Sequence, residues 1–271
     1  MVDAPYCRRR PFASNRSSSF GVAFGDLEFI GATQPTPSPA AHEALHREPR
    51  PVRAGNRGRN VTMEPMDDAG TAQRWDSAYE RGDATCSWFQ ERPSCSLGMF
   101  ERAGVAPEDS VIDVGGGAAR LVDELVGRRF CDLTVLDVSE VGLGHARARL
   151  GADGERVTWL VADVLRWAPA CTYAVWHDRA VFHFLTAEED QRHYLRALHA
   201  ATTLGAVAIF GCLALDGPSS CSGLPVARYD AAGIAERLGE RWQLVADDRE
   251  EHTTPGEVVQ PFSWAALRRR S

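Results

Sequence analysis

The sequence predicts an α/β protein in which a mostly parallel, doubly wound sheet carries helices on both faces. Three observations predict this class. Short apolar runs alternate with amphipathic stretches along most of the 271-residue chain. Three consecutive glycines follow the first buried run. A short, turn-rich segment separates the last two apolar runs, and so short a connection requires an antiparallel hairpin at the end of the sheet.

The expected elements follow one another in the order of a parallel sheet wrapped by helices. Five strand candidates come first, at Ser110–Val114, Asp132–Leu136, Val157–Val161, Ala174–His177 and Ala206–Cys212. Helix-like stretches lie between them, near Ala119–Arg128, Glu140–Leu150 and Glu188–Thr203. After Asp230–Leu238 come two further strand candidates joined by Thr253-Thr254-Pro255-Gly256, namely Gln243–His252 and Val258–Arg268. Five parallel strands closed by a hairpin differ from an ordinary dinucleotide-binding domain.

The chain divides into a tail and one folded domain. Residues 1–62 are rich in Arg, Ser, Pro, Gly and Ala and show no sustained apolar period, so they cannot support a packed core. We expect this segment to be disordered or a non-native extension from a start codon placed too far upstream of Met63 or Met66. Residues 63–271 should form the domain.

Charge and cysteine usage limit the partners. The net charge is -7, and residues 61–271 carry 32 acids against 21 arginines, whereas nucleic acid binding needs a basic surface. The seven cysteines are odd in number and never form C-x-x-C, as is typical of reduced thiols rather than of disulfides or a zinc site. No apolar run approaches the roughly 18 residues that span a membrane. We expect a cytoplasmic protein that binds neither nucleic acid, membrane nor metal; the oligomeric state is left open.

The glycine-rich segment is the first candidate site. Val111-Ile112-Asp113-Val114 leads into Gly115, Gly116 and Gly117, where a buried strand must turn sharply into a helix. Residues without a side chain let the backbone approach a ligand, and the helix presents free N–H groups there. Such a turn by itself is also compatible with a strand-to-helix connection that binds nothing.

Two acids at neighbouring strand ends favour a nucleoside ligand. Asp137 closes the second strand twenty residues beyond Gly117, where a carboxylate can accept from two ribose hydroxyls. Asp163 follows the third strand. Because the carboxyl ends of parallel strands meet at one edge, both acids should lie beside the glycine turn.

The turn also discriminates between nucleotides. Arg120 stands where the pyrophosphate-binding turn of NAD enzymes has its last glycine, and Asp113 precedes the first glycine by two residues. A buried carboxylate would repel a pyrophosphate but would attract the ammonium and sulfonium groups of S-adenosylmethionine.

These motifs resemble the class I, seven-strand S-adenosylmethionine-dependent methyltransferases, whose fold is Rossmann-like, over roughly Trp75 to Arg268. The Trp75–Tyr79 pattern is also loosely similar to seven-strand protein-lysine methyltransferases. The resemblance implies that Asp113 lies near the methionyl amino group and that the glycine backbone passes under the cofactor. It further implies that N-terminal helical segments cover the cofactor. The implied cofactor-binding residues are Asp113, Gly115, Gly116, Gly117, Asp137, Val138, Asp163, Val164, Trp75 and Tyr79. Among them Asp137 would hold the ribose, Asp163 and the Val164 N–H would hold the adenine, and Trp75 and Tyr79 would belong to the lid. Many members have a further glycine where this chain has Ala119.

The segment after the fourth strand should face the transferable methyl group. His177 is a candidate general base and Asp178 its neighbour, although both His177 and His183 are also compatible with purely local hydrogen bonds. Aromatic and polar residues elsewhere could shape the acceptor pocket or simply pack and pair locally. The candidate substrate residues are Trp88, His183, Arg228, Tyr229, His252 and Gln260.

The expected activity is methyl transfer to an oxygen, nitrogen or sulfur nucleophile on a small molecule or a protein, with S-adenosyl-L-methionine as cofactor. No Asn-Pro-Pro-Tyr run follows the fourth strand, which disfavours amino methylation of nucleic-acid bases. Two alternatives remain open at this point: an NAD-dependent oxidoreductase and a non-catalytic nucleoside-binding module.

Overall fold

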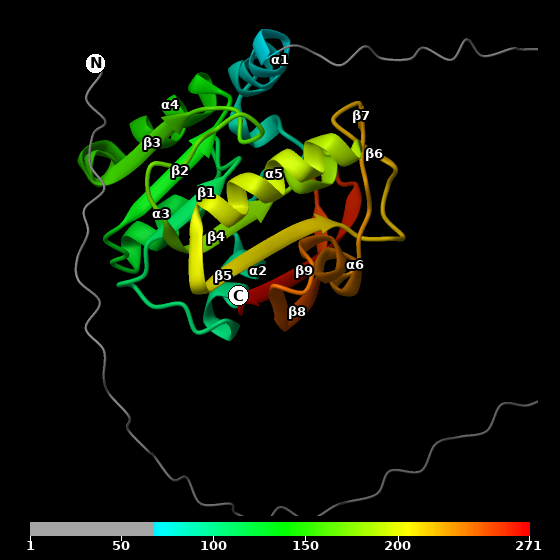
Figure 1. Ribbon diagram of the computed structural model, residues 1–271. Helices are drawn as coiled ribbons and strands as arrows, with labels where there is room; N and C mark the ends of the chain where they lie inside the picture. Colours follow the sequence, from blue (N-terminus) through cyan, green and yellow to red (C-terminus); the bar gives the residue numbers. More distant parts are fainter. Residues whose placement is uncertain (1–67) are drawn as a thin grey trace, which may run out of the picture. The chain divides into compact units, whose positions relative to one another are not determined.

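The sheet has seven strands in the order β3-β2-β1-β4-β5-β9-β8 (Figure 1). The computed structural model describes residues 68–271, so the expected tail at residues 1–62 lies outside the described residues. Strands β1 to β5 run parallel, whereas β9 is antiparallel to both β5 and β8. The strand bounds are β1 Val111–Val114, β2 Leu133–Asp137, β3 Val157–Val161, β4 Tyr173–Arg179, β5 Thr202–Leu213, β8 Trp242–Thr253 and β9 Val259–Arg269. The predicted fold class is confirmed, including the closing hairpin.

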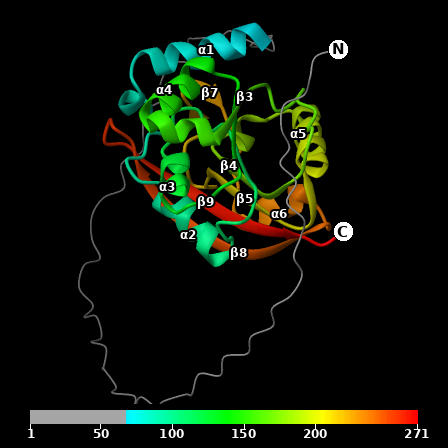
Figure 2. The same cartoon turned by 90° about the vertical axis from the view of Figure 1, so that its left-hand side faces the viewer.

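Helices cover both faces of this sheet. Figure 2 shows α2, α3 and α4 on one side of the strands and α5 and α6 on the other. The helix bounds are α1 Asp68–Glu80, α2 Ser94–Arg102, α3 Leu121–Gly127, α4 Glu140–Leu150, α5 Glu188–Ala200 and α6 Ala231–Leu238, with short 3-10 helices η1 Asp83–Thr85, η2 Gly151–Arg156 and η3 Phe182–Phe184. None of the helices in this part of the chain combines the length and apolar character that crossing a lipid bilayer requires.

Alternation along the strands sorts the side chains into two cores. In β4, Val175 belongs to the cluster packed under α2, α3 and α4, while Trp176 belongs to the cluster under α5 and α6. Successive side chains of a strand point to opposite faces. His177 and Arg179 therefore share the α2/α3 face with Asp113, the register partner of His177. Asp178 lies on the opposite face.

The boundary between α5 and β5 differs from the prediction. The helix expected to reach Thr203 ends at Ala200, and the strand expected from Ala206 already begins at Thr202. Thr202 Oγ1 donates to the Leu198 carbonyl at 2.7 Å, while its backbone pairs with Tyr173 of β4. Pairing with a neighbouring strand thus overrides the helical pattern of the sequence there.

The segment after β5 contains a small hairpin formed by β6 (Ser220–Cys221) and β7 (Leu224–Pro225). Its two turn residues, Ser222 and Gly223, have φ of 50° and 76°, as a tight primed turn requires. The turn reaches α1, because Arg74 Nη2 donates to the Ser222 carbonyl at 2.6 Å.

Helix α1, the cyan helix in Figure 1, packs against α4. Asp76 accepts from Ser139 Oγ at 2.6 Å and from the Val141 N–H at 3.3 Å. Ser139 itself accepts from the Gly142 N–H as the N-cap of α4. The acid of α1 therefore adds negative charge at a helix N-terminus, which the helix dipole favours. This contact holds α1 above the carboxyl ends of β1 and β2.

Candidate functional site

A cavity of about 50 Å³ lies on the α2/α3 face at the carboxyl ends of β1 and β4, and we call it the inner cavity. The glycine turn forms one side of it, and the segment from Trp88 to Ser96 forms another. Its lining residues are Tyr79, Asp83, Trp88, Phe89, Gln90, Pro93, Ser96, Asp113, Gly115, Gly116, Ala118, Ala119, Arg120, Leu121, His177 and Arg179. The sequence-predicted turn and its preceding acid thus meet the end of β4 in one place.

The glycine turn needs glycine for both conformation and space. Gly115 and Gly117 have φ of 67° and 43°, a region that residues with a side chain adopt at a cost. A Cβ on Gly115 would collide with Val181, and one on Gly117 would collide with the hydroxyl of Tyr79. The bare backbone lets these side chains, or a ligand in their place, approach the start of α3.

Asp113 and His177 form a buried pair across the β1–β4 register. His177 Nδ1 lies 2.7 Å from Asp113 Oδ1, and His177 Nε2 lies 3.1 Å from Ser96 Oγ. Because a carboxylate only accepts, Nδ1 carries a proton and donates it to Asp113, while Nε2 shares a hydrogen bond with the Ser96 hydroxyl. Both ring nitrogens of the candidate base therefore have partners, and the ring orients Asp113 beneath the glycine turn.

Asp137 lies at the end of β2, where the sequence places it, but it is covered. The Ser139 N–H donates to its Oδ1 at 2.7 Å, and Tyr79 and Asp137 both press against Gly117. Burial raises the pKa of Asp137 to about 7, despite the backbone donors that lower it. Tyr79 is 6% exposed and also fills the space beside Gly142. The carboxyl group of Asp137, the predicted ribose ligand, is thus covered by α1 and does not line the inner cavity.

The predicted adenine-binding residues follow β3 next to Asp137. The Ala162 N–H donates to the Asp137 carbonyl at 2.9 Å, which fixes the end of β3 against β2. Asp163 Oδ1 accepts from the Leu165 N–H at 2.9 Å, and Val164 is buried in the α5/α6 core. Val138 lies directly after β2 and is partly buried. These residues share the carboxyl edge, although none of them lines the inner cavity.

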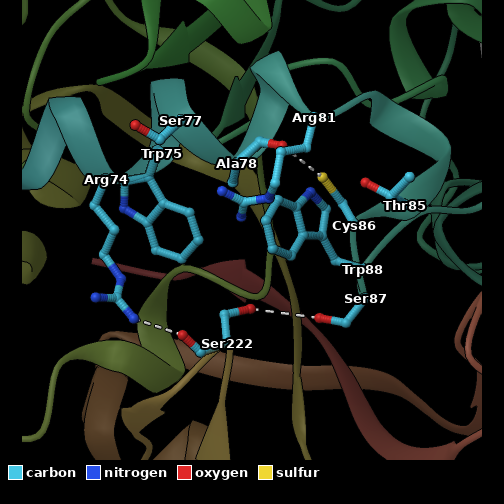
Figure 3. Close-up of a pocket in the computed structure, with 10 residues that line it drawn as sticks. All are labelled: Arg74, Trp75, Ser77, Ala78, Arg81, Thr85, Cys86, Ser87, Trp88 and Ser222. Atoms are coloured by element: carbon cyan, nitrogen blue, oxygen red, sulfur yellow. Dashed lines mark hydrogen bonds between the residues drawn. The ribbon is translucent and has the colours of Figure 1, made fainter.

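A second cavity of about 520 Å³, the outer cavity, lies against α1 (Figure 3). Trp75 and Trp88 meet edge to face with ring centroids 5.4 Å apart, and Trp75 also contacts Phe184. The residues around it are Arg74, Trp75, Ser77, Ala78, Arg81, Thr85, Cys86, Ser87, Trp88 and Ser222. Trp88 lines both cavities, so its indole stands between them.

Two further candidate substrate residues are buried beside the inner cavity. His183 Nδ1 accepts from the Leu213 N–H at 3.3 Å, and His252 Nε2 donates to the Ser87 carbonyl at 2.7 Å. Burial and the neighbouring Arg179 lower the pKa of both rings, for His183 to about 3. Gln260 is the register partner of His252 in the hairpin. His183 and His252 are therefore neutral near pH 7.

The other predicted residues lie apart from both cavities. Asp178 is fully buried on the α5/α6 face, where it accepts from the Val181 and Phe182 N–H groups and from the Tyr194 hydroxyl. Tyr229 packs in the same core and accepts from Gln191 at 3.1 Å. Arg228 donates to the Gly217 carbonyl at 2.9 Å. All three fasten loops at the carboxyl edge.

Sequence reasoning missed several residues of the inner cavity. Arg179, Arg120, Gln90 and Ser96 line it, and Glu250 reaches its wall by accepting from Gln90. Arg179 could have been found, because two-residue periodicity places it on the face of His177. Arg120 could also have been found, because it directly follows the glycine turn. Gln90, Ser96 and Glu250 come from distant segments, and only tertiary packing brings them there.

The described residues give no sign of a metal centre or a disulfide. No group of three or more His, Cys, Asp or Glu gathers among residues 68–271 in a way that could hold a metal ion. The six cysteines in this range are all free.

Comparisons with known proteins agree with this geometry. The family model described as "Methyltransferase domain" matches residues 111–205, from β1 into β5. EEF1A lysine methyltransferase 2 of Danio rerio is 26% identical over 147 residues, covering 48% of this chain and 63% of that protein. The chain therefore spans less than two thirds of this relative's length.

Solved methyltransferase structures share the fold. The N-methyltransferase NodS from Bradyrhizobium japonicum, in complex with S-adenosyl-L-homocysteine, is 18% identical, covers 72% of this chain and 98% of its own, and has a TM-score of 0.56. The 1,6-didemethyltoxoflavin-N1-methyltransferase of Burkholderia thailandensis, with bound S-adenosylhomocysteine, is 15% identical, covers 78% and 94%, and also has a TM-score of 0.56. The family match over residues 111–205, the sheet order and the glycine turn with its preceding acid all agree with a methyltransferase domain that has the class I, seven-strand fold and uses S-adenosylmethionine.

Proposed function

We propose that this protein transfers the methyl group of S-adenosylmethionine to a nucleophilic oxygen, nitrogen or sulfur atom of a small molecule or a protein. The acceptor attacks the methyl carbon in line, and the sulfonium leaves as a neutral thioether. The cofactor supplies the reactive bond, whereas the chain supplies alignment and a site from which water is excluded.

The observation that carries this proposal is the buried carboxylate of Asp113 beneath the glycine turn. His177 holds one of its oxygens, and a Cβ on Gly116 would lie 2.7 Å from the other. That second oxygen has space for an ammonium donor only because the turn lacks side chains. A pyrophosphate would be repelled there, which supports the methyl donor over the NAD alternative.

The remaining cofactor assignments are part of the same proposal. Asp137 and Val138 would hold the ribose hydroxyls, and Asp163 with the Val164 N–H would hold the adenine edge. Trp75 and Tyr79 of α1 would cover the nucleoside. Their common position at the carboxyl ends of β1, β2 and β3 supports these roles.

Positioning is the contribution that the geometry supports best for His177. Its Nδ1–H donates to Asp113, and its Nε2 is hydrogen-bonded to the Ser96 hydroxyl. It would act as a general base only if an acceptor hydroxyl or amine took the place of Ser96 Oγ. Asp178, whose carboxylate holds the β4–η3 turn, would act on the site only through that turn.

Cofactor choice is tested by ligand-dependent melting of the full chain. S-adenosylhomocysteine at about a hundredfold excess over its Kd should raise Tm by about 5 °C, since a ligand bound only to the folded state stabilises it by about 2.7 kcal/mol. NADH should leave Tm unchanged. Transfer of labelled methyl from S-adenosylmethionine to a cell extract then separates an enzyme from a non-catalytic nucleoside-binding module.

Asp113→Asn is the matched variant for this test. It should abolish most of the S-adenosylhomocysteine shift, because the amide no longer offers a charge to the ammonium group. Asp153→Asn, at an exposed ion pair with Arg156, is the control and should keep the full shift. A shift with NADH alone, or no label in any acceptor, would contradict the proposal.

A further inference from the structure

Arg179 is a buried cation whose hydrogen bonds are only partly satisfied. Its side chain is 10% exposed and lines the inner cavity, with the guanidinium 4.8 Å above the Phe262 ring. Nη1 donates to the Trp88 carbonyl at 2.9 Å. Nε and Nη2, the two nitrogens on one edge of the guanidinium, have no partner. That edge presents two parallel N–H groups, the geometry that matches a carboxylate.

The nearest acid does not satisfy this edge. Glu250 Oε2 lies 3.9 Å from Arg179 Nε, too far for a hydrogen bond. Glu250 is held by other donors, because Gln90 Nε2 donates to Oε1 and Trp264 Nε1 donates to Oε2 at 2.9 Å. The acid reduces the local positive charge but leaves both N–H groups of the edge free.

His183 adds a third free donor in the same neighbourhood. Its Nδ1 accepts from the Leu213 N–H, so the proton of the neutral ring is on Nε2. Nε2 is buried and has no partner. The Phe262 ring links the two side chains, because the Arg179 guanidinium lies 4.8 Å from its centre and the centre of the His183 ring lies 6.1 Å from it. A buried donor without a partner destabilises the fold, so a ligand that supplies acceptor atoms would stabilise this cluster.

We propose that Arg179, assisted by His183, binds a carboxylate group of a small-molecule methyl acceptor. This inference rests on the proposed methyl transfer and specifies its acceptor. A carboxylate supplies the acceptor oxygens that the free edge lacks. A lysine ammonium supplies only donors, and two nearby acids already have partners: Glu250 accepts from Gln90 and Trp264, and Asp113 accepts from His177 and would also bind the cofactor's ammonium group. The cluster therefore favours an acidic small molecule over a protein lysine.

The cofactor's own carboxylate is the other source of the same chemistry, and Arg120 is the better partner for it. Arg120 follows the glycine turn directly, lines the inner cavity, and has a buried Nε without a partner. Its guanidinium lies 5.7 Å from the centre of the Phe89 ring. Arg179 lies on β4, nearer the closing hairpin. Two arginines thus face two carboxylates, one from each substrate.

The outer cavity is also basic. Arg74 and Arg81 line it, and Figure 3 shows the Arg74 guanidinium turned toward Ser222. These cations would attract an anionic molecule to the outer cavity. A volume of about 520 Å³ is large enough for a small acidic metabolite.

The test uses the full chain, methyl-labelled S-adenosylmethionine and the small-molecule extract of the source cells. The extract is divided by strong anion exchange at about pH 8, where a carboxylic acid with a pKa near 4 is ionised and retained. Half of the retained fraction is treated with carbodiimide and methylamine. This treatment converts carboxylates to neutral amides, whereas phosphate groups stay negatively charged. Label should appear in the retained fraction and disappear after amidation.

Variants separate the two carboxylate sources. Arg179→Gln should lower kcat/KM for the retained fraction by about 100-fold, in the range expected for removing one partner of a buried charge pair. Its Kd for S-adenosylhomocysteine should change by less than about threefold. Arg120→Gln should instead weaken S-adenosylhomocysteine binding strongly and change kcat/KM for the retained fraction less. Arg179→Lys, which keeps the charge but loses the fork, should fall between the parent and Arg179→Gln. Arg249→Gln, at an exposed pair with Asp216, is the control and should match the parent.

Each other result has a definite meaning. Label in unretained molecules or in protein, or label that survives amidation, would overturn the acceptor assignment while leaving methyl transfer intact. An equal loss of S-adenosylhomocysteine affinity and turnover in Arg179→Gln would show that Arg179 holds the cofactor, and would also overturn it. Absence of label from every fraction would instead refute the proposed function. Because the fractionation is done with the parent protein, the inference stays testable even if Arg179→Gln does not fold.

Discussion

Asp137 illustrates how burial changes a residue whose position the sequence fixes. The carboxyl group stands at the end of β2, beneath Tyr79, and burial raises its pKa to about 7. The neighbouring acids Asp113 and Asp76 raise it further, while donors from Ser139 and Gly117 lower it. In the proposed binding mode two ribose hydroxyls donate to this group, so the ionised form is the one that binds.

We predict that cofactor affinity rises with pH around neutrality. When the pH is below the Asp137 pKa of about 7, the carboxyl group is neutral and must lose its proton before it can accept hydrogen bonds from the ribose. The Kd for S-adenosylhomocysteine should therefore fall about tenfold between roughly pH 6 and pH 8 and level off above that. Titration calorimetry at several pH values measures this.

Asp137→Asn isolates the effect. The amide cannot titrate, so this variant should bind more weakly and lose the tenfold dependence, while any pH dependence from the ligand itself remains. A parent and variant with the same pH profile would exclude Asp137 as the ribose ligand.

At the scale of elements, helix α1 lies over the proposed nucleoside site. Asp76 fastens the helix to the start of α4, and Tyr79 from the same helix presses on Gly117 and Gly142. Tyr79 also meets Trp88 edge to face, with centroids 5.8 Å apart. With the hydroxyl against Gly117, a ribose bound to Asp137 has no room, so cofactor binding requires the Tyr79 ring to withdraw.

We predict that Tyr79→Ala binds the cofactor faster than the parent. Removing the ring opens the space above Gly117, so the association rate for S-adenosylhomocysteine should rise by about tenfold, on the scale of gating by lids and loops. Stopped-flow tryptophan fluorescence can follow this, because Trp88 contacts the ring that moves.

Tyr79→Phe is the matched control for the gate. It keeps the ring and should associate nearly as slowly as the parent, although it lacks the hydroxyl against Gly117. Equal association rates for the alanine variant and the parent would mean that the ring does not obstruct the site.

Across the whole molecule, buried titratable groups act in opposite directions on stability. Burial lowers the pKa of His183 to about 3 and raises the pKa of Asp178 to about 6. The neutral His183 ring stabilises the fold above the pKa of an unfolded histidine, near 6.5, and this contribution is lost as pH falls toward about 3. The neutral form of Asp178 has the opposite effect, favouring the fold as pH falls.

Denaturant unfolding of the parent and of His183→Gln at several pH values separates the contribution of His183 to stability from that of Asp178. The carboxyl groups are common to both proteins, so they cancel in the difference. From about pH 7 to pH 5 the parent should lose about 2 kcal/mol of unfolding free energy relative to the variant, because the unfolded histidine takes up a proton that the buried ring refuses. Parallel pH profiles would show that His183 titrates normally in the folded protein.

The strand pattern, the glycine turn and the closing hairpin could all be predicted from local signals. Apolar runs gave the seven strands of the main sheet to within a few residues, and Thr253–Gly256 indicated the antiparallel end. The prediction failed at Thr202, where the neighbouring strand decided the conformation. There, pairing with a segment distant in the sequence outweighed local preference.

Sequence alone determined the resemblance to methyltransferases, because Asp113, the three glycines and the acid of Asp137 are ordered by spacing along the strands and need no knowledge of packing. The tertiary structure decided what surrounds them. Only the folded chain brings Tyr79 onto Asp137, Ser96 onto His177, and Glu250 beside Arg179 without satisfying it. These contacts join segments that are far apart in the sequence, and the burial and unmet hydrogen bonds that they create arise from packing, which spacing in a sequence does not encode.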